Sequence, residues 1–320
     1  MPVSFEHPIE AEASIFSTVE NRLRKLSRIF SSLPGYPSLR TVTRKVLLVA
    51  APTRNVFMRP DPASPARRNC QEITILSANL WHDWPRQTRR LERLEAFSSL
   101  VEAEKVDICL LQEVARTPEL RADEWLADRL GMAYVYSRAN GHESSIGFEE
   151  GLAVFSRFPL SQPRLRRLGP LKNPFVRRLA LGATLQTPCG DLSAYSVHLG
   201  LMQKENAAQV RHLREWVGSQ PALETALIGG DFNAHEDTPQ MQAARRSWID
   251  LFRQHSPQGD GATHELTWPW GKPFLRQRLD YLFVQPGRQI WRILEARHLD
   301  APGGPHSDHR AVLARLALAS

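Results

Sequence analysis

The apolar strands of the longer, C-terminal part of the chain are joined in two different ways, and this mixture constrains the fold more than any other feature. Some strands are separated by amphipathic helices, as residues 72–80 and 106–114 are separated by the helical pattern of residues 88–104. Others follow one another through short turns, as residues 177–187 and 190–200 do. The whole pattern predicts about nine strands with three or four helices. Neither a βα barrel nor a purely parallel sheet fits this mixture, so we expect two packed sheets with helices outside them.

Polar residues recur where these strands end. A carboxylate inside a strand as apolar as residues 107–114, "DICLLQEV", is costly to bury unless a partner offsets its charge. A hard divalent cation is such a partner, because Mg²⁺ takes oxygen ligands, often one or two carboxylates with waters. Each residue alone has a structural explanation, such as a turn for Asn79, an ion pair for Glu113 or a core position for His198. So many at strand ends are better explained by one site, formed by Asn79, Glu113, His198, Asp231, Asn233, Asp280, Ser307, Asp308 and His309.

Residues 227–239, "LIGGDFNAHEDTP", end a buried strand with two glycines and a polar pair. Alternate residues of a strand share a face, so Asp231 and Asn233 can point to the same side while Phe232 packs on the other. The glycines let the backbone approach its neighbours and a phosphate closely. The structural alternative is an Asx-type turn.

Seven short blocks carry a resemblance to a known family. In chain order they are "SANLW", "LLQEV", "EGLAVFSRFP", "SVHLG", "GGDFNA", "RLDYLFV" and "SDHRAV". Together, over residues 72–317, they resemble the endonuclease/exonuclease/phosphatase superfamily, which includes deoxyribonucleases, abasic-site endonucleases, sphingomyelinases and inositol-phosphate phosphatases. The resemblance implies an α+β fold, a four-layer α/β/β/α sandwich of two packed mixed sheets with the site at one edge. This agrees with the order of elements described above.

The resemblance also implies a metal site. Glu113 matches the family's principal Mg²⁺ ligand, and Asn79 lies beside it. Asp308 would bind a second metal or brace the site. We therefore expect Mg²⁺ as the cofactor, with Mn²⁺ as a substitute.

The catalytic residues that the resemblance implies come from four blocks. His309 matches the histidine of the "SDH" motif and Asp280 the carboxylate that orients it, a pairing that fixes the tautomer and favours imidazolium. The sequence leaves open whether His309 is a general base or stabilises charge on the phosphate. Asp231 would position or deprotonate the attacking water, and Asn233 would hold a phosphoryl oxygen. His198 would protonate the leaving oxygen or contact the phosphate.

Residues 1–70 differ from the rest in charge and texture. The chain carries a net charge of +7, of which residues 1–70 contribute +6 through 11 Lys and Arg against 5 Asp and Glu. Residues 9–33 have the pattern of a basic amphipathic helix, and residues 59–69 that of a linker. We expect a partly helical or disordered extension over residues 1–70 and the catalytic domain over residues 71–320. Such a helix can lie on an anionic membrane surface, and the alternatives are packing on its own domain or no fixed structure.

Two further features concern the substrate. Residues 164–178, "RLRRLGPLKNPFVRR", carry six basic residues and no acid, so Arg177 and Arg178 are candidate contacts to a polyanion or a lipid headgroup. A solvated charged face is the alternative. Trp268 is a candidate for stacking on a base or touching lipid, with core packing as the alternative.

Cysteine usage and hydropathy bear on the compartment. Cys70, Cys109 and Cys189 are too widely spaced for a disulfide framework or a zinc signature, so a reducing compartment fits. We expect a cytoplasmic monomer that can lie at a membrane surface. No apolar run reaches the ~20 residues of a membrane-spanning helix.

The function expected from these features is that of a Mg²⁺-dependent hydrolase. A phosphodiesterase acting on a nucleic acid or a phospholipid headgroup by metal-assisted water attack fits best. A small-molecule phosphomonoesterase is one alternative. A catalytically silent scaffold with the same fold is another.

Overall fold

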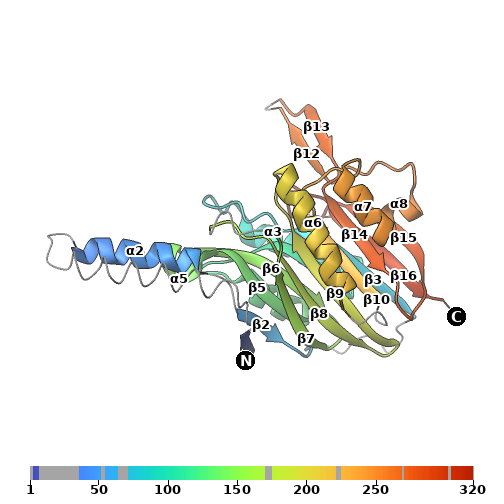
Figure 1. The fold of residues 1–320 in the computed structure, drawn as a ribbon, viewed down its shortest axis with the longest axis horizontal. Helices are drawn as coiled ribbons and strands as arrows, with labels where there is room; N and C mark the ends of the chain where they lie inside the picture. Colours follow the sequence, from blue (N-terminus) through green and yellow to red (C-terminus); the bar gives the residue numbers. More distant parts are fainter. Residues whose placement is uncertain are drawn as a thin grey trace.

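The protein was analysed as a computed structural model, which describes residues 3–6, 36–51, 55–63, 71–169, 175–220, 225–268, 270–301 and 304–319. Two mixed sheets pack face to face with helices outside them (Figure 1). This is the expected α+β architecture of four layers, and the prediction is confirmed.

The first sheet has eight strands. In spatial order they are β1 (Val3–Glu6), β2 (Asn55–Arg59), β5 (Ala133–His142), β6 (Phe148–Ser156), β4 (Ile108–Arg116), β3 (Glu72–Asn79), β16 (Ala311–Leu318) and β15 (Trp291–Leu299). The second sheet has six strands: β11 (Ile249–Asp250), β14 (Asp280–Gln285), β10 (Thr225–Asp231), β9 (Gly190–His198), β8 (Leu179–Thr187) and β7 (Leu160–Arg167). A separate hairpin of β12 (His264–Thr267) and β13 (Pro273–Gln277) projects from this body (Figure 1).

Three apolar clusters hold the layers together. The central cluster fills the space between the sheets, where Leu110 of β4 and Leu227 of β10 are both fully buried. On the outer face of the first sheet pack α3 (Arg90–Ala103) and α4 (Ala122–Leu130), and on that of the second α6 (Gln203–Gly218) and α7 (Pro239–Ser247). Two short helices, α5 (Glu143–Ile146) and α8 (Leu251–His255), complete the domain. Burial of apolar area on both faces of each sheet therefore fixes the sandwich.

Strand register brings the polar strand ends to one edge. β3 and β4 are parallel, with Asn79 opposite Gln112, and β9 and β10 are parallel, with His198 opposite Asp231. β14 runs antiparallel to β10, so its first residue, Asp280, lies opposite Asp231. Carboxyl ends of β3, β4, β9 and β10 thus meet the amino end of β14 at this edge, which we call the site edge.

The region before residue 70 is only partly separate from the domain. β2 pairs with β5 and so belongs to the first sheet, which places part of the expected extension inside the sandwich. Helix α2 (Tyr36–Ala50) extends outward beside α5 (Figure 1). The amphipathic helix expected over residues 9–33 lies outside the described residues. In the described part of the chain, no helix has the length and apolarity needed to span a bilayer.

The cysteines need a correction. Cys109 is free and buried in β4. Cys189, in contrast, is disulfide-bonded. Because disulfides are rare in the cytosol, the cysteines no longer argue for a reducing compartment.

The two glycines of "LIGGDFN" serve the packing of the sheets. A Cβ at Gly229 would lie 2.7 Å from both Leu110 Cδ1 and Leu282 Cδ2, where the two sheets face each other. A Cβ at Gly230 would collide with the main-chain oxygen of Val197 in β9. The glycines therefore let β10 approach its neighbours, which places Asp231 at the end of a closely packed strand.

We expect Gly229→Ala to lower the free energy of unfolding by about 1–3 kcal/mol, because the added methyl group overpacks the interface between the sheets. Urea denaturation measures this loss. Gly218→Ala is the control, since a Cβ at this helix residue meets nothing within 4 Å. The control should be as stable as the wild type or more stable by up to about 1 kcal/mol. A Gly229→Ala protein as stable as the wild type would show that the sheets have room for the methyl group.

Candidate active site

A bulge in β4 aims Glu113 into the site edge. Between Leu111 and Val114 the register with β6 shifts, so that β4 has one residue more than its partner. Glu113 takes a left-handed backbone with φ of 54°, which is uncommon for a residue other than glycine. Bulges of this kind redirect a side chain next to a functional site. Here the neighbouring Gln112 points between the sheets and donates to the Ser196 hydroxyl at 3.0 Å, while Glu113 lies at the site edge.

Asn79 links carboxylates from the two sheets. Its Nδ2 donates to Glu113 Oε1 at 3.0 Å and to Asp231 Oδ2 at 3.2 Å. Its Oδ1 accepts the main-chain N–H of Trp81 at 2.9 Å. The nitrogen that faces the carboxylates cannot bind a cation, so in this orientation Asn79 positions Glu113 and Asp231 rather than serving as the predicted metal ligand.

Asp231 is held by a turn as well as by Asn79. Its Oδ1 accepts the main-chain N–H of Asn233 at 2.9 Å, the hydrogen bond of an Asx-type turn. The turn and the site are therefore the same feature and not alternatives. Phe232 is fully buried and packs on the aromatic rings of β14, as the strand alternation predicted. The amide of Asn233 donates to the main-chain oxygen of Leu199 at 2.9 Å, which ties this turn to the end of β9.

Asp280 and His309 form a buried pair. His309 Nδ1 lies 2.8 Å from Asp280 Oδ2, which also accepts the Thr263 hydroxyl at 2.6 Å. Burial by itself would lower the pKa of His309, but the negative charge of Asp280 and its hydrogen bond override burial and raise the pKa to about 10. The ring is therefore an imidazolium at neutral pH.

His198 behaves in the opposite way. Its Nε2 lies 3.6 Å from Asp231 Oδ2. Burial and the positive charges of Arg178 and His309 lower the pKa of His198 well below its usual value. A neutral ring can donate a hydrogen bond to a phosphoryl oxygen, but it is a poor source of a proton for a leaving group.

The acidic residues at this edge have the chemistry of a site for a hard cation. Burial, together with the nearby charge of Asp280, raises the pKa of Asp231 to about 7. Asp280 Oδ1 is buried without a hydrogen-bond partner among the described residues. Asp231 and Asp280 each bring a carboxylate oxygen to within 4.8 Å of the other and of a ring nitrogen of His309, whose protonated ring offers no lone pair to a metal. Crowded carboxylate oxygens with unsatisfied capacity are the ligands that Mg²⁺ and Mn²⁺ prefer.

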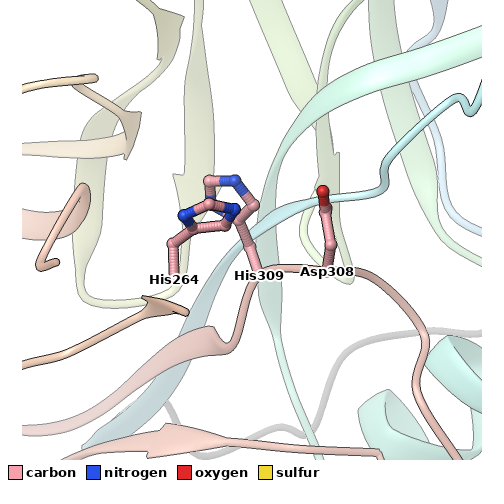
Figure 2. Close-up of side chains that lie close together, drawn as sticks. All are labelled: His264, Asp308 and His309. Carbon is pink, nitrogen blue, oxygen red and sulfur yellow. The ribbon is translucent and has the colours of Figure 1, made fainter. Parts of the chain in front are cut away.

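The loop before β16 supplies the remaining motif residues. The Ser307 hydroxyl donates to Asp308 Oδ1 at 3.2 Å and accepts the main-chain N–H of His309 at 3.1 Å. These hydrogen bonds hold the loop in shape. Asp308 is exposed and stands beside the rings of His264 and His309, which lie against each other with centroids 4.5 Å apart (Figure 2). The ligand atoms of these three side chains lie within 4.8 Å of one another, but as an imidazolium His309 offers no lone pair to a cation, which leaves Asp308 and His264 as possible ligands.

The predicted substrate contacts fall in different places. Arg177 is only 2% exposed, and its guanidinium donates to the main-chain oxygens of Ala139 and Val49 at 3.1 and 2.9 Å. It ties α2 to β5, an arrangement that does not suit substrate contact. Arg178 is half-buried and close enough to His198 for its charge to affect that ring. Trp268 is exposed on the β12–β13 hairpin and not in the core.

Several residues of the site carried no sequence signal strong enough to single them out. His82 donates its main-chain N–H to Glu113 Oε2 at 3.0 Å, and its ring lies 3.4 Å from the same oxygen. Glu150 is buried, and burial with the charge of Glu113 raises its pKa. Both residues lie in or beside quoted blocks, "SANLW" and "EGLAVFSRFP", so proximity to a motif was the available signal. Thr263 and His264 lie in no motif.

Comparisons with known proteins agree with this geometry. A family model described as "Endonuclease/Exonuclease/phosphatase family" matches residues 76–309. The uncharacterized protein YbhP of Escherichia coli (strain K12) is 28% identical over 176 residues, which are 50% of this chain and 66% of YbhP, slightly under two thirds of its length.

Solved structures share the fold at low sequence identity. An endonuclease/exonuclease/phosphatase family protein from Leptotrichia buccalis C-1013-b superimposes with a TM-score of 0.64 and 17% identity, over 76% of this chain and 99% of that one. D. rerio TDP2 complexed with a single-strand DNA product superimposes with a TM-score of 0.60 and 15% identity, over 77% of this chain and 98% of that one. The human Nocturnin catalytic domain with bound sulfate superimposes with a TM-score of 0.60 and 18% identity, over 80% of this chain and 97% of that one.

We expect Asp280→Asn to lower the pKa of His309 by at least ~2 units in metal-free protein, because burial then acts without the opposing carboxylate. In the wild type, a folded-state pKa of about 10 against the usual 6.5 makes this pair's stabilisation complete below pH 6.5. That stabilisation is lost as the pH rises through about 10, and the variant should lack this loss. NMR titration of the histidine rings and denaturation at several pH values measure both effects. Asp191→Asn, on the opposite end of β9, is the control; a His309 that still titrates near 10 without Asp280 would contradict the pairing.

Proposed function

The chain belongs to the endonuclease/exonuclease/phosphatase family, and from that premise we propose that it is a divalent-metal-dependent phosphodiesterase. The observation that carries the proposal is the contact of Asn79 with both Glu113 and Asp231 beside the charged His309–Asp280 pair. A carboxylate that could bind a cation, a candidate base and a positive charge at one edge of the sandwich support the proposal.

Glu113 is the residue we assign to the metal, with Asp308 as the candidate for a second ion. Mg²⁺ is the expected cofactor and Mn²⁺ a substitute. When bound, the cation would polarise a phosphoryl oxygen and offset charge that develops there. The carboxylate of Glu113 is already held by Asn79 and by the N–H of His82, so its direction is fixed before any cation binds.

Asp231 is the candidate for water activation. Its raised pKa of about 7 makes its carboxylate a matched proton acceptor at neutral pH. Asn79 and the N–H of Asn233 hold its two oxygens, which leaves the remaining lone pairs for a water molecule. The predicted role of Asn233 as a phosphoryl contact is less well supported, because its amide nitrogen is engaged with Leu199.

The charge states of the two histidines assign them different roles. A His309 with a pKa of about 10 is already protonated at neutral pH, so stabilisation of negative charge on the phosphate suits it better than general base catalysis. His198, whose pKa is lowered, is suited to hydrogen-bonding a phosphoryl oxygen as a neutral ring. The side chain of Arg178 adds a positive charge beside it.

Two classes of phosphodiester are candidate substrates. The D. rerio TDP2 complex holds a single-strand DNA product, which makes a nucleic-acid phosphodiester one candidate for this chain. A phospholipid headgroup is the other, and a small phosphomonoester or a silent scaffold remain alternatives. We propose a monomeric protein that can lie at a membrane surface. The disulfide of Cys189 removes the cysteine argument for the cytoplasm that the sequence offered.

We expect His309→Ala to lower turnover by at least ~10²-fold, because the variant loses a fixed positive charge near the transferred phosphoryl group. The assay follows hydrolysis of bis-p-nitrophenyl phosphate, supercoiled DNA, abasic DNA, sphingomyelin and a phosphomonoester, each with Mg²⁺, Mn²⁺ or EDTA. His255→Ala, at the end of α8, is the control and should keep full activity. An unchanged rate in the His309 variant would remove this residue from the mechanism.

We also expect Glu113→Gln to weaken Mg²⁺ and Mn²⁺ binding at least ~10-fold in a calorimetric titration, because a neutral amide replaces the charged ligand. Glu215→Gln removes the same charge from the outer face of α6 and should bind metal as the wild type does. If the wild-type protein binds neither ion at millimolar concentration, the metal-dependent mechanism fails.

A further inference from the structure

Large exposed apolar side chains gather at the site edge. They include Trp84, Phe175, Leu201, Met202, Trp270 and Phe274, which we call the apolar rim. Exposed apolar residues scattered singly are normal, but a concentration around one site marks a contact surface.

The topology explains why these residues lie together. Trp84 follows β3, and Leu201 and Met202 follow β9, two strands whose carboxyl ends form the site edge. Phe175 precedes β8, whose amino end pairs with the carboxyl end of β9. Trp270 and Phe274 belong to the hairpin that precedes β14, whose first residue is Asp280. Four separate segments of chain thus bring apolar side chains to the edge that holds the site.

The β12–β13 hairpin is the most prominent part of the rim. It projects from the sandwich (Figure 1), and the rings of Trp268 and Trp270 stack at its tip with centroids 5.2 Å apart. Phe274 lies against Trp268 at 4.5 Å, and Trp270 is 72% exposed. No other described element covers this aromatic group, so its apolar surface faces solvent.

Positive charges accompany the rim. Lys204 lies two residues after Met202, Lys272 lies in the turn of the hairpin, and Arg86 follows Trp84. All three are exposed, and none has an ion-pair partner within the described residues. Arg44 and Lys45 on α2 are likewise exposed. Helix α2 packs on α5, and α5 follows the carboxyl end of β5, which lies at the site edge.

We propose that the apolar rim docks on the surface of a bilayer that contains anionic phospholipid. Trp rings suit the interface between headgroups and acyl chains, aliphatic side chains suit the apolar side of that interface, and lysines suit anionic headgroups. With the rim on the bilayer, the site edge faces the headgroup layer. On the basis of the proposed function, the substrate is then a phosphodiester carried by a membrane lipid.

The same observations disfavour a nucleic acid at this rim. Leu201 and Met202 cannot stack on bases as aromatic rings do. The one arginine near the hairpin tip, Arg276, is engaged by Asp260 and Glu265, which leaves Lys272 as the only cation of β12, β13 and their turn without an ion-pair partner among the described residues. A nucleic acid lying along the hairpin would therefore meet a single free cation, because Lys204 and Arg86 lie on separate loops, whereas a bilayer surface can contact all three loops at once.

The first test measures docking without catalysis. The full chain is sedimented with vesicles of phosphatidylcholine alone and of phosphatidylcholine with phosphatidylglycerol. We expect binding that is stronger with phosphatidylglycerol, and at least ~10-fold weaker in the variant Trp270→Ser/Phe274→Ser. Leu201→Ser/Met202→Ser, on a different loop, should also weaken binding. Ile290→Ser is the matched control, because Ile290 is 71% exposed and lies in the turn between β14 and β15, at the opposite end of the sheets.

Three outcomes would overturn the docking proposal. The first is no vesicle sedimentation by the wild type. The second is equal binding by the rim variants and the Ile290 control. The third is light scattering that shows a dimer lost in the rim variants, without vesicle binding, which would assign the rim to a second copy of this chain.

The second test separates docking from chemistry. We expect Trp270→Ser/Phe274→Ser to cleave soluble bis-p-nitrophenyl phosphate at the wild-type rate and vesicle-borne phospholipid at least ~10-fold more slowly. An equal rate on vesicles would overturn the membrane substrate. If the wild type binds vesicles through the rim but hydrolyses none of the phosphoesters, the proposed function fails and the docking surface stands.

Discussion

The two hydrogen bonds donated by the Asn79 amide hold the site together, because they join carboxylates that belong to different sheets. Glu113 comes from a bulge in the first sheet and Asp231 from the last residue of β10 in the second. Without a donor between them, two negative charges at the end of a closely packed sandwich would repel each other. One neutral side chain thus allows the sheets to close over an acidic edge.

The acidic edge remains costly even with this donor. Burial and neighbouring charge raise the pKa of both Asp231 and Glu150, which means that the folded protein resists ionising them. The charged ring of His309 and the hydroxyl of Thr263 both contact Asp280 Oδ2, so this oxygen has partners in the folded protein. A site that holds excess negative charge against this resistance has a standing affinity for cations. Stability is therefore partly given up at the place where metal chemistry is proposed.

Much of the architecture and of the site could be predicted from short patterns, and the residues that could not share a physical reason. The order of strands and helices was enough to predict two packed sheets. The blocks around Asp231 and His309 were enough to predict that these residues share one site. The bulge that directs Glu113 depends on pairing between β4 and β6, which no local pattern records. Arg177 was predicted to contact the substrate because it belongs to a basic run that is visible in the sequence. Its burial depends on the main-chain oxygens of α2 and β5, which the sequence does not show. His264 reaches the site only because a hairpin far along the chain folds back beside β16.

This hairpin connects the surface of the protein to its chemistry. At its base, the ring of His264 lies on His309 (Figure 2). The hydroxyl of the preceding residue, Thr263, contacts Asp280, so both members of the buried pair are contacted from this side. At its tip are the stacked tryptophans of the exposed group. The base of the hairpin, and not its exposed tip, contacts the proposed catalytic histidine, so the proposed membrane contact and the proposed chemistry lie on one short segment of chain without sharing side chains.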